Sequence, residues 1–342
     1  MKTNVLVFTC IIACIISMGC GKDDPIDPVI DEAYFKAFSI KNPHTEIFFD
    51  TAGNYLYVMT VDGGQMIKYD YDQFKVVSIG TKRGTLQDYA FGLGTYLGEP
   101  EIYIGKGSAI EIYDGNTLKL KDSMQVYPLQ DNRYISSIES GGQNLLFIGV
   151  CNSDASGSVV LNRHTKSILT QSHYSYDCFR LRSYHEASTG RVGLIGVAYA
   201  PNFSVILSDK FSTTGELLES NYDSFVQGNI SKGIVRTHDE ADYFISGDAG
   251  TLFSKDSIKV LGSLGGLYLD VMIAAHGDTI YGLSTGRAIE TFTYPGLQKV
   301  NIRELDHNPT MAFLDKGKMI IVYFRTSEEF GKEDIYISKL DL

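Results

Sequence analysis

The chain has 342 residues and a formal net charge of −11, with 44% hydrophobic and 21% charged residues. Such acidity provides no basic surface for nucleic acid, and the balance of apolar and charged residues is typical of a well-cored globular protein. Gly occurs 34 times, and no long stretch after residue 33 has apolar residues at helical spacing. The sequence therefore predicts little helix and many tight turns.

The amino terminus has the features of an export signal. After Met1–Lys2 comes the apolar run Val5–Ile16, which is of signal-peptide length and too short to span a bilayer. The run ends before Ser17-Met18-Gly19-Cys20, and a small residue followed by Cys at this boundary resembles the processing site of bacterial lipoproteins. The resemblance implies that Cys20 becomes the acylated first residue of the mature protein. Cys14 is an alternative acylation site, and a plain secreted protein is the alternative to lipidation.

The residues after Cys20 suggest where such a lipoprotein resides. Gly21-Lys22-Asp23-Asp24 resembles the acidic tag of surface-exposed lipoproteins of Bacteroidetes-type bacteria. The resemblance implies an outer-membrane protein that faces the cell exterior and touches the membrane only through acyl chains such as palmitate. The expected division is a signal peptide at 1–19, an acylated Cys with a Pro- and Asp-rich tether at 20–33, and one domain at 34–342.

The stretch Glu101–Lys121 shows the unit of which that domain is built. Apolar residues alternate with polar ones in two strands, and Gly- and Asn-bearing turns separate these from each other and from a third strand. The second strand of the unit recurs at intervals of 36 to 50 residues, at Tyr55–Thr60, Glu101–Gly105, Leu145–Val150, Val192–Ala198, Tyr243–Gly247, Thr279–Leu283 and Lys318–Phe324. A period of this length with several short strands is typical of propeller blades.

We therefore expect an all-β fold, a seven-bladed β-propeller, with six- and eight-bladed rings as alternatives. Inner strands are expected before six of the seven second strands, and Thr81–Tyr96 is expected to be a long loop. The last unit has only three strands, so the strand at Tyr34–Ile40 is expected to complete it and close the ring. The pattern resembles the superfamily of seven-bladed propellers that includes quinoprotein-like and YncE-like proteins. The chain lacks the Trp-Asp dipeptides of WD repeats, because it contains no Trp.

Ligand-binding residues are expected in the loops that lead into the inner strands, because propellers usually bind ligands on that face. An Asp or Asn followed by an aromatic recurs there, together with Arg83, Arg133, Arg180 and Arg182, which suits flat or carboxylate-bearing ligands. The alternative is that these residues cap turns and pack between blades. The expected ligand-binding residues are Arg83, Asp88, Tyr89, Arg133, Tyr134, Phe179, Arg180, Tyr268 and His307.

The sequence also contains candidates for a disulfide and for a metal site. Cys151 and Cys178 are expected on the same face of neighbouring blades, where they form either a disulfide or two unlinked buried thiols. The segments at His238 and His276 are expected to be solvated turns, so no metal site is predicted, and no Gly-X-Ser-X-Gly motif or other catalytic signature occurs. No cofactor is expected, because quinone sites rely on Trp stacking.

The favoured function is that of a non-enzymatic surface lipoprotein, accessory to TonB-dependent nutrient uptake. Its expected partners are the transporter or its lipoprotein partner, and its expected ligand is a glycan or a peptide. Absence of Trp weakens the glycan case, since sugar platforms are usually Trp and the 22 Tyr would have to replace them. The alternatives are an extracellular propeller hydrolase or lyase acting on sugars, and a scaffold that docks another outer-membrane protein.

Overall fold

The computed structural model describes residues 35–41, 45–60, 65–81, 90–127, 134–142, 144–151, 156–174, 180–200, 203–223, 234–328 and 332–342. The chain divides into Met1–Ala33 and Tyr34–Leu342, and all described residues belong to the second unit. The expected signal peptide, Cys20 and tether therefore lie outside the described residues. Within those residues, no helix has the length and apolar character needed to cross a membrane.

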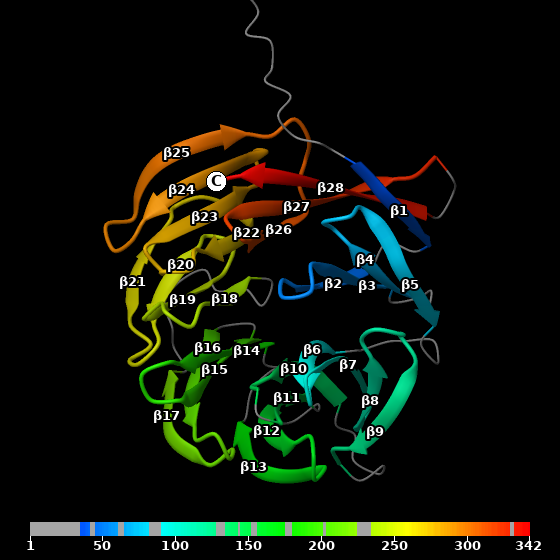
Figure 1. Ribbon diagram of the computed structural model, residues 1–342. Helices are drawn as coiled ribbons and strands as arrows, with labels where there is room; N and C mark the ends of the chain where they lie inside the picture. The colour runs from blue at the N-terminus through cyan, green and yellow to red at the C-terminus, as the bar shows by residue number, and fades with distance from the viewer. Residues whose placement is uncertain are drawn as a thin grey trace, which may run out of the picture. The chain divides into compact units, whose positions relative to one another are not determined.

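The unit Tyr34–Leu342 consists of seven four-stranded antiparallel sheets arranged as the blades of a ring, which confirms the predicted seven-bladed β-propeller (Figure 1). The inner strands, one per blade, are β2 (Thr45–Asp50), β6 (Phe91–Tyr96), β10 (Tyr134–Ser140), β14 (Arg180–Glu186), β18 (Val235–Thr237), β22 (Tyr268–Ile273) and β26 (Met311–Asp315). The second strands are β3 (Tyr55–Thr60), β7 (Glu99–Lys106), β11 (Leu145–Cys151), β15 (Arg191–Ala200), β19 (Tyr243–Ser246), β23 (Thr279–Ser284) and β27 (Lys318–Thr326).

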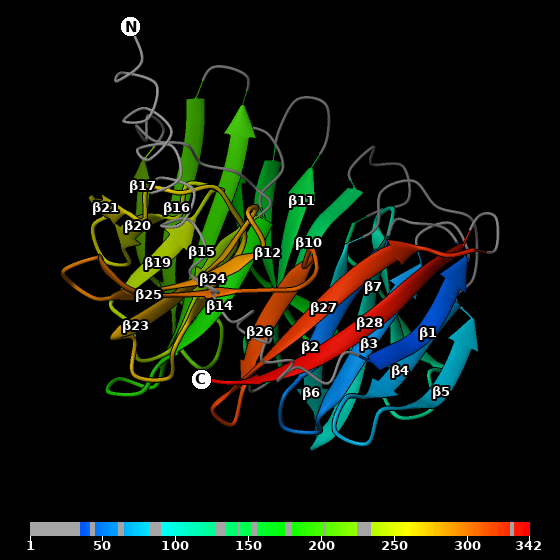
Figure 2. The ribbon, with the colours of Figure 1, turned by 90° about the horizontal axis from the view of Figure 1, so that it is seen from above.

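Two further strands complete each blade toward the rim. The third strands are β4 (Gln65–Asp70), β8 (Ala109–Asp114), β12 (Ser156–Asn162), β16 (Phe203–Phe211), β20 (Thr251–Ser254), β24 (Ala288–Thr293) and β28 (Lys332–Asp341). The outer strands are β5 (Lys75–Thr81), β9 (Leu120–Gln125), β13 (Ser167–Tyr174), β17 (Leu217–Asp223), β21 (Val260–Ser263), β25 (Gln298–Glu304) and β1 (Phe35–Lys41). The blades are uneven in height, because β15 and β16 are longer than β19 and β20 and extend past them on one face (Figure 2).

The ring closes through β1, as the sequence predicted. This strand pairs antiparallel with β28, and Figure 1 shows the two side by side in blue and red. Asp334 of β28 accepts hydrogen bonds from Lys36 Nζ at 2.7 Å and from Ser39 Oγ at 2.6 Å. The first and last parts of the chain therefore share one blade, which leaves no unpaired gap in the ring.

The expectation that Thr81–Tyr96 is a loop was wrong at both ends, because Thr81 is the last residue of β5. Phe91–Tyr96 forms β6, the inner strand of the second blade, while 82–89 lie outside the described residues. Its sequence FGLGTY gives a weak strand signal because of Gly92 and Gly94. A Cβ at Gly92 would lie 2.7 Å from the carbonyl oxygen of Ile138, and one at Gly94 would lie 2.7 Å from Ser140 Cβ. The glycines thus let β6 approach the next inner strand closely.

The hydrophobic core lies between the blades. In the described residues it consists of seven apolar clusters, one at each interface between neighbouring blades. The cluster between the first two blades, for example, combines Tyr57 and Met59 with Ile102 and Ile104, all of them buried. Each blade contributes apolar side chains from both faces of its sheet, which explains the apolar runs of the second strands. The stacked blades provide a rigid frame for the residues around the axis.

Candidate ligand-binding channel

All seven inner strands contribute residues to one cavity on the axis of the ring, with a volume of about 420 Å³. We call this cavity the channel. Its volume lies within the range of small-molecule sites in proteins. Its described lining divides into a charged part and an apolar part, which lie on opposite sides of the axis.

The charged part comes from four consecutive blades, the third to the sixth. Its ionisable residues are Glu139 of β10, Arg180 and Arg182 of β14, Arg236 of β18 and Asp270 of β22. Three arginines against two carboxylates give the described channel wall a formal charge of +1. This is a local cationic site in a chain whose net charge is −11. The described wall of the channel is therefore more positive than the protein as a whole.

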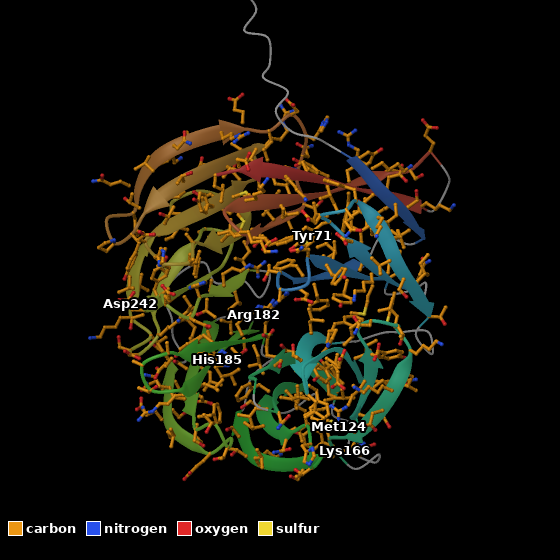
Figure 3. The ribbon with its side chains drawn as sticks, in the orientation of Figure 1. Tyr71, Met124, Lys166, Arg182, His185 and Asp242 are labelled. Carbon is orange, nitrogen blue, oxygen red and sulfur yellow. The ribbon has the colours of Figure 1, made fainter. Side chains whose placement is uncertain are left out.

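Two ion pairs across blade interfaces hold this part in place. Arg182 Nη1 pairs with Glu139 Oε1 and donates to the carbonyl oxygen of Leu181 at 3.0 Å, and Figure 3 shows Arg182 at the inner edge of the ring. Arg236 Nη2 lies 2.6 Å from Asp270 Oδ1, and its Nη1 donates to the carbonyl oxygen of Val235 at 3.1 Å. The Asp270 side chain is only 2% exposed. Both carboxylates thus serve to fix an arginine in the wall.

The apolar part comes from the seventh, first and second blades. It consists of Ile47, Phe48, Phe49, Leu93, Met311 and Phe324. Phe49 stacks on Phe313 with ring centroids 4.1 Å apart, and Phe48 meets the edge of Phe91 at 6.3 Å. Because these rings are supported by others behind them, the apolar wall is a fixed surface that suits an aromatic or aliphatic group.

The expected ligand-binding residues are placed in different ways. Arg180 begins β14 and lines the channel, and Tyr134 begins β10, paired in register with Cys151. Tyr268 is buried in the core of the fifth and sixth blades, where its hydroxyl donates to Glu290 Oε2 at 2.9 Å and burial raises its pKa. The others, Arg83, Asp88, Tyr89, Arg133 and Phe179, lie outside the described residues.

His307 lies beside another arginine instead of among the channel residues. Arg325 Nη2 is 2.6 Å from His307 Nδ1. Since a guanidinium can only donate, Nδ1 accepts, and the imidazole is the neutral Nε2–H tautomer. Burial and the neighbouring charge of Arg325 both lower the pKa of His307. Of the expected residues that the structure describes, Arg180 therefore contributes to the channel, while Tyr268 and His307 have partners elsewhere.

Sequence reasoning missed most of the channel. It considered Arg182 but singled out neither this residue nor Glu139, Arg236 and Asp270, all of which lie within inner strands. The available signal was a charged residue inside an otherwise apolar inner strand, as in the IVRTH segment around Arg236. A buried or half-buried charge requires a partner, so such residues indicate ion pairs or ligand contacts.

Where the structure describes them, the cysteines and histidines singled out in the sequence lie apart from the channel lining. Cys151 is disulfide-bonded, and its expected partner Cys178 lies outside the described residues, so the pairing of these two stays a prediction. Among the described residues, no group of three or more His, Cys, Asp or Glu side chains is arranged to hold a metal ion. His238 and Glu240 lie in the turn between β18 and β19, and His276 in that between β22 and β23.

Comparison with known proteins identifies the fold alone. No protein-family model matches the sequence, and no curated protein matches it. The solved structure of U3-55K superimposes with a TM-score of 0.62 at 11% identity, covering 89% of this chain and 98% of that one. The RRP9 WD40 repeats give 0.61 at 10% identity over 89% and 97%, respectively. The Cps50 (Swd1) propeller domain of Myceliophteria thermophila gives 0.57 at 11% identity over 89% and 99%. The chain thus shares its architecture with WD40 propellers without containing a Trp.

Proposed function

We propose that this protein is a non-enzymatic binding lipoprotein of the outer-membrane surface that captures a ligand in the channel for a TonB-dependent uptake system. The observation that carries the binding role is the two-sided channel, in which an apolar wall faces arginines held by ion pairs. A rigid concave site with a few fixed polar groups is typical of small-molecule recognition. The proposed anchor and location rest on the resemblance of residues 1–24 to lipoprotein signals.

The channel favours a peptide over a glycan as the ligand. Its apolar wall is built from Phe, Met, Leu and Ile, and it offers arginines on the other side. Glycan platforms usually present a wide aromatic face, most often Trp, together with several hydrogen-bonding groups for hydroxyls. A short peptide with an apolar side chain and a charged terminus matches both walls.

A hydrolase or lyase acting on sugars is the second candidate, because Glu139 and Asp270 line the same channel and such enzymes use two carboxylates. Against it, each of these carboxylates is bound by an arginine. A catalytic carboxylate must reach the reacting bond of the substrate, whereas these two are engaged in fixing the arginines of the wall. The binding role therefore fits the ion pairs better than catalysis does.

The proposal can be tested with a tryptophan placed in the channel. Because the chain contains no Trp, Leu269→Trp introduces a single fluorescent reporter at a residue that lines the channel and is 42% exposed. Leu267→Trp is the matched control, since Leu267 lies two residues earlier, is 58% exposed and does not line the channel. We expect short peptides to change the emission of the first variant and not of the second.

Panels of short peptides and oligosaccharides would be titrated against both variants, with product analysis of the same mixtures. Equal responses of the two variants, or no response to any compound, would contradict binding in the channel. Appearance of cleaved sugar would favour the enzyme.

The proposed partner is tested by purifying the lipidated protein from detergent-solubilised outer membranes of its host. We expect a TonB-dependent transporter to be recovered with it in stoichiometric amount. A protein recovered alone would contradict the partnership.

A further inference from the structure

Arg182 is the arginine best placed to bind a ligand in the channel. Within the described part of the chain its hydrogen bonds all leave from Nη1, to Glu139 and to the carbonyl oxygen of Leu181. The side chain is 24% exposed, so Nε–H and Nη2–H remain available at the cavity. These two groups form one edge of the guanidinium and donate in parallel, which matches the two oxygens of a carboxylate.

Charge limits the kind of anion that fits. Glu139 and Asp270 already pair with Arg182 and Arg236, so carboxylate oxygens of the wall lie beside two of its arginines. A group with one negative charge occupies the open edge of Arg182, whereas a phosphate monoester or a polysulfated sugar would place further negative charge near these carboxylates. The net charge of −11 adds a long-range repulsion that grows with the charge of the ligand.

The opposite wall determines what the anion is attached to. Phe48, Met311 and Phe324 present apolar surface across the axis from the arginines. Burying an apolar group there removes it from water, with a gain of roughly 25 cal/mol per Å². The cavity of about 420 Å³ limits that group to the size of a large amino-acid side chain with a short extension.

We infer that the channel recognises an apolar group that carries a single carboxylate, with the carboxylate on Nε and Nη2 of Arg182 and the apolar body against Phe48, Met311 and Phe324. This inference rests on the proposed function and specifies its ligand class. Two sources share this chemistry, the carboxyl terminus of a peptide that ends in an apolar residue and a free aryl or alkyl carboxylic acid.

The test uses calorimetric titration of the full protein with two acid and amide pairs, Ala-Ala-Phe with Ala-Ala-Phe amide, and 3-phenylpropionate with 3-phenylpropionamide. We expect each acid to bind about 10- to 100-fold more tightly than its amide, the ratio that one charge-assisted contact supplies. The pair that binds more tightly identifies the source of the carboxylate.

Two variants distinguish recognition of the carboxylate by the parallel donors of Arg182 from a general effect of positive charge or of an altered fold. Arg182→Lys keeps the positive charge but removes the parallel donors, so the acid-to-amide ratio is expected to fall at least about fivefold while amide affinity is unchanged. Arg191→Lys is the control, because Arg191 belongs to the same blade and pairs with Glu219 at 2.7 Å without lining the channel. Its ratio is expected to equal that of the wild type.

The outcomes that overturn the inference differ from those that overturn the proposed function. Equal affinity for acids and amides, or an equal loss of both in Arg182→Lys, would overturn carboxylate recognition while leaving the channel a binding site. Failure of all four compounds to bind would overturn the inference, and the wider panel with the Leu269→Trp reporter would then decide whether the channel binds anything.

Discussion

Glu101 and Asp209 are both buried carboxylates near blade interfaces, but they have opposite surroundings. Arg163 from the third blade reaches Glu101 with two parallel hydrogen bonds, Nε to Oε2 at 2.8 Å and Nη2 to Oε1 at 3.0 Å. Lys121 Nζ lies 2.8 Å from Oε1, and the Tyr103 hydroxyl donates to Oε2 at 3.0 Å. Every lone pair that burial removes from water thus has a donor.

Asp209 of β16 has no such donors. Its neighbours at alternate positions of the strand, Leu207 and Phe211, belong to the apolar cluster between the third and fourth blades, as does its cross-strand partner Leu194. The residue is 0% exposed, and neither carboxylate oxygen has a hydrogen bond of normal geometry. Ser220, its cross-strand partner on β17, is the polar side chain that lowers its pKa.

The two environments shift the pKa values of Glu101 and Asp209 in opposite directions. At Glu101, burial alone would raise the pKa, but the hydrogen bonds from Arg163 and Lys121 outweigh it and hold the pKa below its usual value. At Asp209, burial raises the pKa from 3.8 to about 6, and Ser220 offsets this only in part. The difference shows that the donors around a carboxylate, rather than burial itself, decide whether it stays charged.

The largest effect is expected from removing the donors of Glu101. Arg163→Met leaves a charged carboxylate at 0% exposure, which should lower the free energy of unfolding by about 3–5 kcal/mol at pH 7. Lys121→Met is the control within the same site, because Lys121 is 38% exposed and its loss should cost about 1 kcal/mol or less. Urea titration of both variants measures the effect, and similar losses in the two would show that Arg163 is not the decisive partner.

At Asp209 the comparison predicts that removing the charge stabilises the protein. Asp209→Asn removes a charge that the folded state holds unfavourably, so the free energy of unfolding should rise by on the order of 2–3 kcal/mol at pH 7. The asparagine keeps the shape of the protonated acid, so the packing between Leu207 and Phe211 is retained.

The pH dependence of this gain follows from the sign of the shift. Because the folded-state pKa lies above 3.8, the folded protein binds the proton more tightly, and the stability that Asp209 contributes is complete below pH 3.8 and lost as the pH rises through about 6. The difference between the variant and the wild type should therefore be near zero at pH 3.5, grow up to pH 6 and level off above it. A difference that does not change with pH would mean that Asp209 is not titrating in the folded state.

The sequence predicted the repeated architecture well, because the alternating strands and turn residues of each blade lie within one short segment of the chain. Seven blades and the closing strand β1 followed from the count of such units. The strand β6 was missed because its glycines are needed for close packing against Ile138 and Ser140. Those two residues lie in the next blade, so the sequence around β6 does not reveal why glycine occurs there.

The site was predicted only in part for a related reason. Arg182 and Glu139 are 43 residues apart in the chain, and Arg163 and Glu101 are 62 apart. Both separations are too long for a local sequence motif to reveal the pair. Each pair forms only when two neighbouring blades are aligned so that these residues meet. The period of the repeat does not specify that alignment. Arg180 was found because it follows an Asp-Cys-Phe segment at the start of an inner strand, whereas Arg236 and Asp270 have no such neighbour.

The smallest effect is expected from giving Asp209 the kind of partner that Glu101 has. Ser220 lies opposite Asp209 in the β16–β17 ladder and is exposed, so Ser220→Lys places an ammonium group beside the carboxylate without entering the core. The cation should lower the pKa of Asp209 and raise the free energy of unfolding at pH 7 by about 1 kcal/mol.

Ser220→Gln, which has a long side chain but no charge, separates the electrostatic effect from added packing. We expect the lysine variant alone to show a flatter stability profile between pH 4 and pH 7, measured by urea titration at each pH. Because the new ammonium group is near the surface, 1 M salt should remove most of its effect. If the profile stays as steep as in the wild type, a single cation at the rim does not compensate for burial, and the stability of Glu101 depends on the buried fork of Arg163 rather than on nearby positive charge.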